Sequence, residues 1–169
     1  MKKILVLFIC INSFLFLGAQ GTGGKDISEL SGKKILGLFP SQVKGQSANK
    51  DKDKVFGPKK HIGVTVHRDY TSGKKKMTLT LVNRSPSVTT VNELITKTSA
   101  SNSGKYTVAD IKGYPALIQK VVSENNSPYL ELLLPINNSL LILKGNDVTE
   151  NDLITEARKI NLEKIAENL

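Results

Sequence analysis

Few residues of this chain have the types and spacing that nucleophilic or acid–base chemistry requires. His67, Asp69 and Ser72 lie close together in the sequence, and a serine, a histidine and a carboxylate that converge can activate the serine hydroxyl. The chain has no G-x-S-x-G turn that would expose such a nucleophile. His67 and Asp69 occupy alternate positions of an expected strand, so their side chains share one face. We therefore interpret them as polar surface residues of a hairpin.

Metal ligands are equally sparse. The two histidines, His61 and His67, are six residues apart. A zinc site needs three or four His, Cys or carboxylate ligands, and six residues of extended strand separate two side chains by about 20 Å. Both histidines are therefore expected to be neutral and exposed, and the sequence predicts no metal site and no cofactor.

Two further patterns give no sign of catalysis. Asp110, Glu124 and Glu131 are available as paired acids for glycoside hydrolysis, but Glu124 lies in an expected turn and Glu131 is flanked by leucines. The glycines of GPKKHIG do not follow the phosphate-binding pattern. We interpret Asp110, Glu124 and Glu131 as solubilising charges.

Positive charge is concentrated in the first part of the chain. Residues 25–76 contain 13 Lys or Arg against 5 Asp or Glu, whereas residues 77–169 contain 9 against 10. Such asymmetry is typical either of contact with an anionic partner or of a solvated basic loop. Nucleic acid is not expected, because the basic clusters lack the aromatic residues that stack on bases. The candidate anion-binding residues are Lys50, Lys52, Lys54, Lys59, Lys60, Lys74, Lys75 and Lys76.

The first nineteen residues have the organisation of a secretory signal peptide. Lys2 and Lys3 precede an apolar segment at residues 4–17, and small residues lead to Ala19. That segment is too short to span about 30 Å of hydrocarbon. We expect cleavage near Ala19 and export to the periplasm or the cell exterior. Since Cys10 lies within the signal, the processed chain contains no disulfide and no thiolate.

The hydrophobic periodicity of residues 20–169 alternates between helical and extended segments. Residues 20–60 are predicted to form a leader, a short helix capped by Asp26 or Ser28 and stopped by Pro40, and a basic flexible loop over residues 42–60. Residues 61–169 are predicted to form the core domain. It starts with a hairpin over residues 62–82 and a helix over residues 91–98, which a Thr90 and Glu93 capping box begins. Strands then follow at 106–110, 116–122, 129–134 and 139–144, with helices at 150–160 and 162–167.

This order predicts an α+β fold. An antiparallel sheet with helices on one face forms a two-layer sandwich. We expect a single sandwich with a mainly antiparallel sheet of about five or six strands.

The stretch IKGYPALIQKVV, residues 111–122, prescribes a bend that feeds a strand. Gly113 can adopt a positive φ, Pro115 fixes its own φ, and the residue before a proline is held extended. Tyr114 is then either a contact residue at the edge of the sheet or a half-buried aromatic residue with a wet hydroxyl.

Several segments together resemble a group of small exported bacterial proteins without an assigned function. They are ISELSGKKILGLFP, VTVHRDY, MTLTLV, VADIKGYPAL and LLILKGNDVTENDLITEARKINLEKI. The second half is also similar to the PsbP-like α/β sandwich, in which a GY.A corner, here GYPA, introduces sheet strands and a helix closes the domain. The resemblance implies this fold and an exported location, and it carries over no catalytic residues.

These patterns favour an exported noncatalytic binding or interaction module of the bacterial cell envelope. Its partner would be an anionic envelope component or a protein, contacted through residues 44–60 and the exposed sheet face, with His67 and Tyr114 as candidate contact residues. One alternative is an extracytoplasmic enzyme that uses His67, Asp69 and Tyr114. Another is a tether whose basic loop holds anionic envelope lipid or polysaccharide. We prefer the noncatalytic module because catalysis requires convergent reactive groups.

Overall fold

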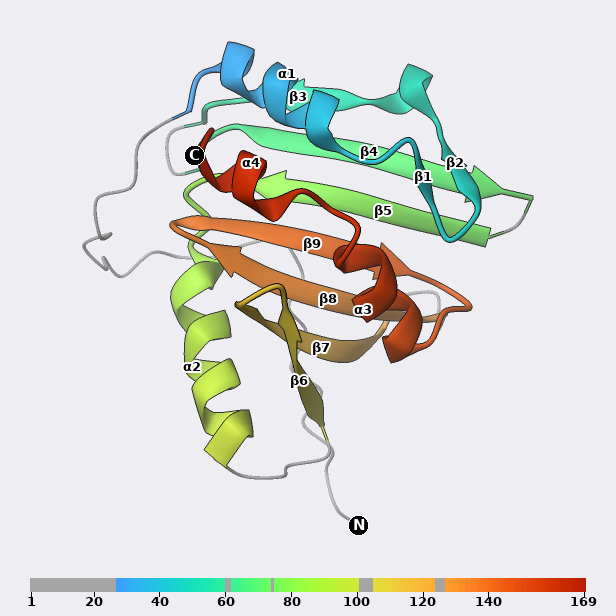
Figure 1. Cartoon of the computed structure of the whole chain (residues 1–169), viewed down its shortest axis with the longest axis vertical. Helices are drawn as coiled ribbons and strands as arrows, with labels where there is room; N and C mark the ends of the chain where they lie inside the picture. The colour runs from blue at the N-terminus through green and yellow to red at the C-terminus, as the bar shows by residue number, and fades with distance from the viewer. Residues whose placement is uncertain (1–26, 60–61, 74, 101–104, 124–126) are drawn as a thin grey trace.

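The computed structural model describes residues 27–59, 62–73, 75–100, 105–123 and 127–169. The expected signal peptide, including Cys10 and Ala19, lies outside these residues, as does Asp26. Within the described residues, nine strands form one antiparallel sheet, and four α-helices pack against it (Figure 1).

The helices are α1 (Glu29–Leu38), α2 (Ser87–Ala100), α3 (Glu150–Ala157) and α4 (Leu162–Ala166), and a single turn of 3-10 helix, η1, covers Lys50–Lys52. The strands are β1 (Gln42–Val43), β2 (Gln46–Ala48), β3 (Lys54–Phe56), β4 (Thr65–Ser72), β5 (Lys75–Val82), β6 (Tyr106–Ile111), β7 (Tyr114–Val122), β8 (Pro128–Ile136) and β9 (Ser139–Gly145). Their order across the sheet is β1-β2-β4-β5-β9-β8-β7-β6, and β3 pairs with β4 on the same edge as β2.

The predicted α+β class is confirmed, as are the β4–β5 hairpin and the antiparallel β7–β8–β9 meander. The prediction of five or six strands is wrong. Strands β1, β2 and β3 lie in the segment that was expected to be a flexible loop. Each has only two or three residues, too few to show a period in a polar sequence. These strands form because β4 supplies their partners.

Side chains of β4 hold this segment in place. Arg68 donates to both carboxylate oxygens of Asp53, with Nε–Oδ1 at 2.9 Å and Nη2–Oδ2 at 2.6 Å, and its Nη1 donates to the Phe39 carbonyl at 3.0 Å. Tyr70 donates its hydroxyl to the Pro40 carbonyl at 2.9 Å. The hydrogen bond with Asp53 raises the pKa of Arg68, whereas burial raises the pKa of Tyr70.

The helices cover both faces of the sheet, so the prediction that they share one face is wrong. On the first face, α1, α3 and α4 pack over the larger core (Figure 1). On the second face, Val91 and Ile95 of α2 form a separate cluster with Leu117, Leu133 and Leu140. Successive residues of a strand point to opposite faces, and the apolar runs of β7, β8 and β9 therefore provide a core on each side.

Helices α1 and α3 begin at the signals that the sequence contains. Ser28 caps α1 through a hydrogen bond that its Oγ accepts from the Ser31 N–H at 3.2 Å. Thr149 and Asp152 form a reciprocal capping box at the start of α3. Such boxes satisfy backbone N–H groups that lack helical partners.

The predicted start of α2 is wrong. The helix begins at Ser87, so Thr90 and Glu93 lie inside it and form no cap. Pro86 directly precedes the helix, and the fixed φ of proline suits the start of a helix.

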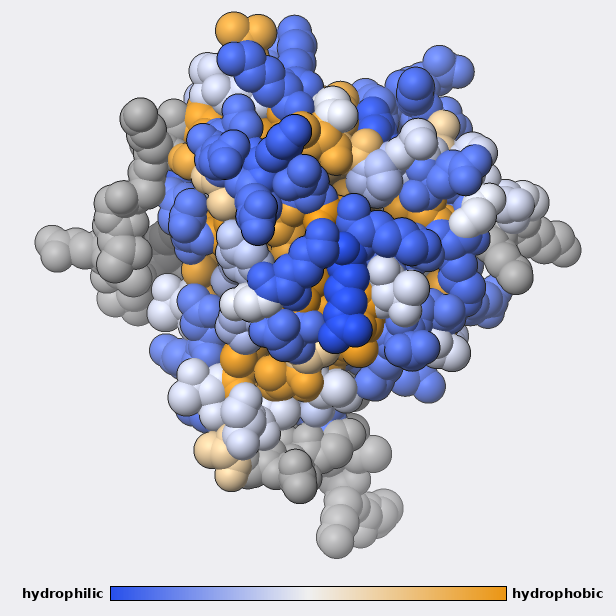
Figure 2. Space-filling model, in the orientation of Figure 1, coloured by the Kyte–Doolittle hydropathy of each residue, from blue (hydrophilic) through white to orange (hydrophobic). Residues whose placement is uncertain are grey.

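Helix α1 contacts the sheet closely through Gly32. A Cβ at this position would lie 2.6 Å from Cγ1 of Val64 and 2.7 Å from Cγ1 of Val55. On the side of the molecule where α1, α3 and α4 lie, hydrophilic residues cover much of the outer surface, with hydrophobic ones visible between them (Figure 2). None of the described helices is long and apolar enough to cross a membrane.

Candidate ligand-binding surface

A row of mainly polar side chains crosses six adjacent strands on the second face. Cross-strand pairing places Asp69 beside Thr78, Thr78 beside Lys144, and so on across the sheet. Residues paired directly across antiparallel strands point to the same side. With strands about 4.8 Å apart, the row is about 24 Å long. This polar row consists of Asp69, Thr78, Lys144, Glu131, Gln119 and Tyr106.

Helix α2 leaves most of the polar row uncovered. Its apolar cluster takes in Leu117, Leu133 and Ile142 of the neighbouring row and reaches the polar row only at Tyr106. The other five members of the polar row belong to neither of the two apolar clusters. Four of these five side chains are half-buried along one side of α2, whereas Asp69 is buried, with 7% of its surface exposed.

Interactions within the face fix the orientation of these side chains. Gln119 donates its Nε2 to Oε2 of Glu131 at 3.1 Å. The Lys144 ammonium lies 3.5 Å from the centroid of the Tyr129 ring, within the range of a cation–π interaction. Because strands hold these residues, a ligand would meet preorganised polar groups, which lowers the entropic cost of binding.

His67 lies in the row next to the polar row and is more enclosed than the sequence suggested. Its Nε2 is 3.1 Å from Oδ1 of Asp69, and its Nδ1 is 2.8 Å from Oγ1 of Thr80. Its side chain is 26% exposed. The Asp69 carboxylate also lies 3.4 Å from the Lys76 ammonium. The expectation of a solvent-exposed side chain is wrong for His67, since both ring nitrogens have partners within the sheet, whereas His61 lies outside the described residues.

This geometry does not assemble the catalytic group considered from the sequence. In a catalytic triad one ring nitrogen of the histidine is bonded to a carboxylate and the other to the hydroxyl that it activates, and here the hydroxyl at His67 is that of Thr80 and not that of Ser72. Ser72 is an odd number of positions from Asp69 in β4, so it points to the opposite face. His67, Asp69 and Ser72 therefore do not converge.

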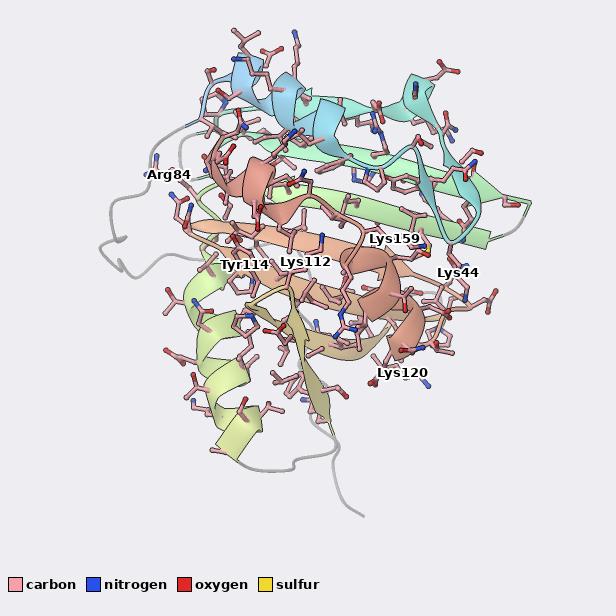
Figure 3. All side chains as sticks on the ribbon, in the orientation of Figure 1. Lys44, Arg84, Lys112, Tyr114, Lys120 and Lys159 are labelled. Atoms are coloured by element: carbon pink, nitrogen blue, oxygen red, sulfur yellow. The ribbon has the colours of Figure 1, made fainter. Side chains whose placement is uncertain are left out.

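The two candidate contact residues lie on opposite faces of the sheet. Tyr114 is half-buried at the start of β7 and packs against the core of the first face, where Figure 3 labels it. His67 belongs to the second face, as its pairing with Thr80 shows. Tyr114 is half-buried, as one of its two interpretations expected, and it does not share a single site with His67.

The candidate lysines separate into two groups. Lys54 pairs directly with His67 and therefore lies on the second face, as does Lys76, which contacts Asp69. Lys50 and Lys52 lie exposed on η1 beside β4, and Lys59 is exposed in an isolated bridge with Ile62. Lys60, Lys74 and the side chain of Lys75 lie outside the described part of the structure.

Five members of the row were not selected from the sequence. Thr78, Lys144, Gln119 and Tyr106 gave no signal there, and Glu131 was interpreted as a solubilising charge. The alternation of β8 indicates that Glu131 points outward. The row becomes visible only once the strand order places β9 between β5 and β8.

Other groupings in the described residues offer less. No group of three or more His, Cys, Asp or Glu side chains there is arranged to hold a metal ion. A shallow depression on α2 is lined by Thr89, Asn92, Glu93, Thr96 and Lys97. Those residues come from one helix, so the depression brings no groups together from different elements.

Comparisons with known proteins add no family assignment. No protein-family model matches the sequence, and no curated protein or solved structure is found to match it.

Proposed function

We propose that this protein is an exported noncatalytic binding module of the bacterial cell envelope, and that an anionic polysaccharide binds along its polar row. The observation that carries this proposal is the row itself, in which donors and acceptors from six strands lie in register outside the main cover of α2. An elongated ligand matches a surface of this shape.

The chemistry of the row suits an acidic sugar polymer. Sugar hydroxyls both donate and accept hydrogen bonds, and the row offers an ammonium, an amide, two hydroxyls and two carboxylates as partners. The row contains one lysine, Lys144, and two carboxylates, Asp69 and Glu131, and Asp110 adds a third carboxylate to the second face. The positive charge that favours an anionic polymer comes from lysines next to the row, Lys54 and Lys76.

Adjacent features extend the same surface. Lys50 and Lys52 lie next to β4 on η1 and continue the positive charge beyond the sheet edge. Tyr129 offers a ring beside Lys144, and aromatic rings supply apolar contact area with a polar tip. Export is part of the proposal and is supported by the signal-peptide pattern of residues 1–19.

Heparin serves as a probe for an anionic polysaccharide in a test of this proposal. The double variant Lys76→Glu with Lys144→Glu should elute from immobilised heparin at markedly lower salt than the parent, because two attractive charges on the row become repulsive. Lys33→Glu with Lys164→Glu changes net charge equally but alters exposed residues of α1 and α4 on the first face. Equal elution of the two double variants would show that retention follows net charge alone and would refute the assignment to the row.

A further inference from the structure

The two edges of the sheet are built differently. One edge of β4 is shared by the short strands β2 and β3, which η1 interrupts, and Lys50, Lys52 and Lys54 lie along it. Short strands, interruptions and lysines are features by which proteins prevent another strand from pairing with an edge. This edge is protected.

The opposite edge, β6, lacks these features. It is a continuous strand of six residues, Tyr106–Ile111, and among the strands that the structure describes it pairs only with β7. Its first four residues, YTVA, contain no charge and no proline. All four are half-buried, because α2 and α3 contact β6 and β7 covers one side. An uncharged, ordered edge of this kind is a template for another strand.

The β6–β7 turn establishes which backbone groups face outward. Lys112 and Gly113 have φ values of 55° and 84° and connect Ile111 to its partner Tyr114. In such a two-residue hairpin the flanking residues form a hydrogen-bonded pair, and bonded and non-bonded pairs then alternate along the strands. The N–H and C=O groups of Tyr106 and Val108 therefore point away from β7.

Asp110 provides an independent check on this assignment. It is the third outward-facing residue by the same alternation, and its carbonyl accepts a hydrogen bond from Nη2 of Arg158 at 3.1 Å. Arg158 directly follows α3, so this carbonyl does point away from β7. The contact between Arg158 and Asp110 also occupies the end of β6 near the turn. The outward backbone groups of Tyr106 and Val108 are therefore the accessible part of the β6 edge.

We propose that β6 joins two copies of this chain by antiparallel strand pairing centred on Thr107. A two-fold axis at Thr107 places Tyr106 of one copy beside Val108 of the other, so that each N–H meets a C=O in both directions. Because the two strands are identical, a second copy of this chain supplies every hydrogen-bond partner that the arrangement needs. The uncharged YTVA segment brings no like charges together across the axis.

The side-chain pattern supports a second copy as the occupant. With Thr107 facing its own symmetry mate, Tyr106 and Val108 of the two copies form a continuous apolar strip on the second face, beside the clusters under α2. The pairing joins the two nine-stranded sheets edge to edge. The interface is short, so association should be weak and should depend on protein concentration.

Sedimentation velocity over a range of concentrations tests the proposal with variants at the centre of the interface. Thr107→Lys and Thr107→Asp each place like charges opposite one another and should weaken self-association by more than about tenfold. An equimolar mixture of the two should restore association, because lysine then faces aspartate. Restoration would also show that both variants are folded.

Matched controls use Thr155, an exposed residue of α3. Thr155→Lys and Thr155→Asp should self-associate as the parent does. A parent that stays monomeric at every concentration would overturn the proposal. Association that persists unchanged in both Thr107 variants would overturn it as well, since another surface would then be responsible.

Discussion

At the scale of single residues, Arg68 and Asp53 form a largely buried ion pair. The two side chains are 8% and 14% exposed and meet through two hydrogen bonds in a bidentate geometry. A buried guanidinium that loses its carboxylate is left without compensation for its desolvation. Since Arg68 also holds the Phe39 carbonyl, this pair connects the first elements to β4.

Asp53→Ala should therefore destabilise the protein by about 3 kcal/mol. Urea denaturation followed by circular dichroism measures the change as a lower midpoint. Asp51→Ala is the matched control, because Asp51 is a neighbouring exposed aspartate of η1, and it should change stability by no more than about 0.5 kcal/mol. Equal midpoints for the two variants would contradict the structural role of the pair.

At the scale of elements, α1 shows how closely a helix can approach the sheet. Its two glycines have different surroundings. Gly32 faces Val64 and Val55 at distances that leave no room for a Cβ, whereas nothing lies within 4 Å of a Cβ at Gly37. Helix propensity favours alanine over glycine by about 1 kcal/mol at either position. The packing at each position should decide whether this gain in helix propensity or the steric cost of a Cβ is larger.

Gly37→Ala should stabilise the protein by about 0.5 to 1 kcal/mol, whereas Gly32→Ala should destabilise it. At Gly32 the added methyl group collides with Val55 of β3 and with Val64, which directly precedes β4, and such overpacking costs about 1 to 3 kcal/mol. Thermal denaturation of both variants and the parent gives the two signs directly. A stabilised Gly32→Ala protein would mean that α1 does not pack at the distance described.

At the scale of the whole molecule, one ion pair connects the beginning and the end of the fold. Lys44, in the turn between β1 and β2, contacts Asp152 at the start of α3. Figure 3 labels Lys44 beside α3. The hydrogen bond from Lys44 is the main cause that lowers the pKa of Asp152 to about 2, and hydrogen bonds from the backbone and side chain of Thr149 contribute. The charged state of Asp152 is thus favoured by folding.

A carboxyl group with a lowered pKa stabilises the fold above its unfolded pKa, and this contribution is lost as the pH falls through the folded value. Lys44→Met should accordingly be less stable than the parent near neutral pH. The difference should close as the pH falls from 3.8 towards about 2. Urea midpoints across this range measure it, with Lys33→Met, which removes an exposed lysine from α1, as the control. A difference that does not narrow in acid would contradict this linkage.

The positive charge of the first third of the chain has a different arrangement from the one the sequence suggested. A flexible loop was expected, but residues 42–56 contain three strands and η1. The local sequence has few apolar residues, and the decisive contacts come from Arg68 and Tyr70, more than a dozen positions along the chain. Such contacts leave no periodic signal within the segment itself.

The sequence by itself determined the α+β class, the β4–β5 hairpin, the meander and the capping of α1 and α3, because each depends on residues that are near neighbours in the chain. Tertiary structure alone decided that β9 pairs with β5, that α2 covers the second face, and that Lys144 and Glu131 join Asp69 in one row. Side-chain alternation assigns a residue to a face but contains no information on which strand lies beside it. Strand order depends on the burial of apolar surface between distant segments, and it determines both the polar row and the position of β6 at the edge of the described sheet.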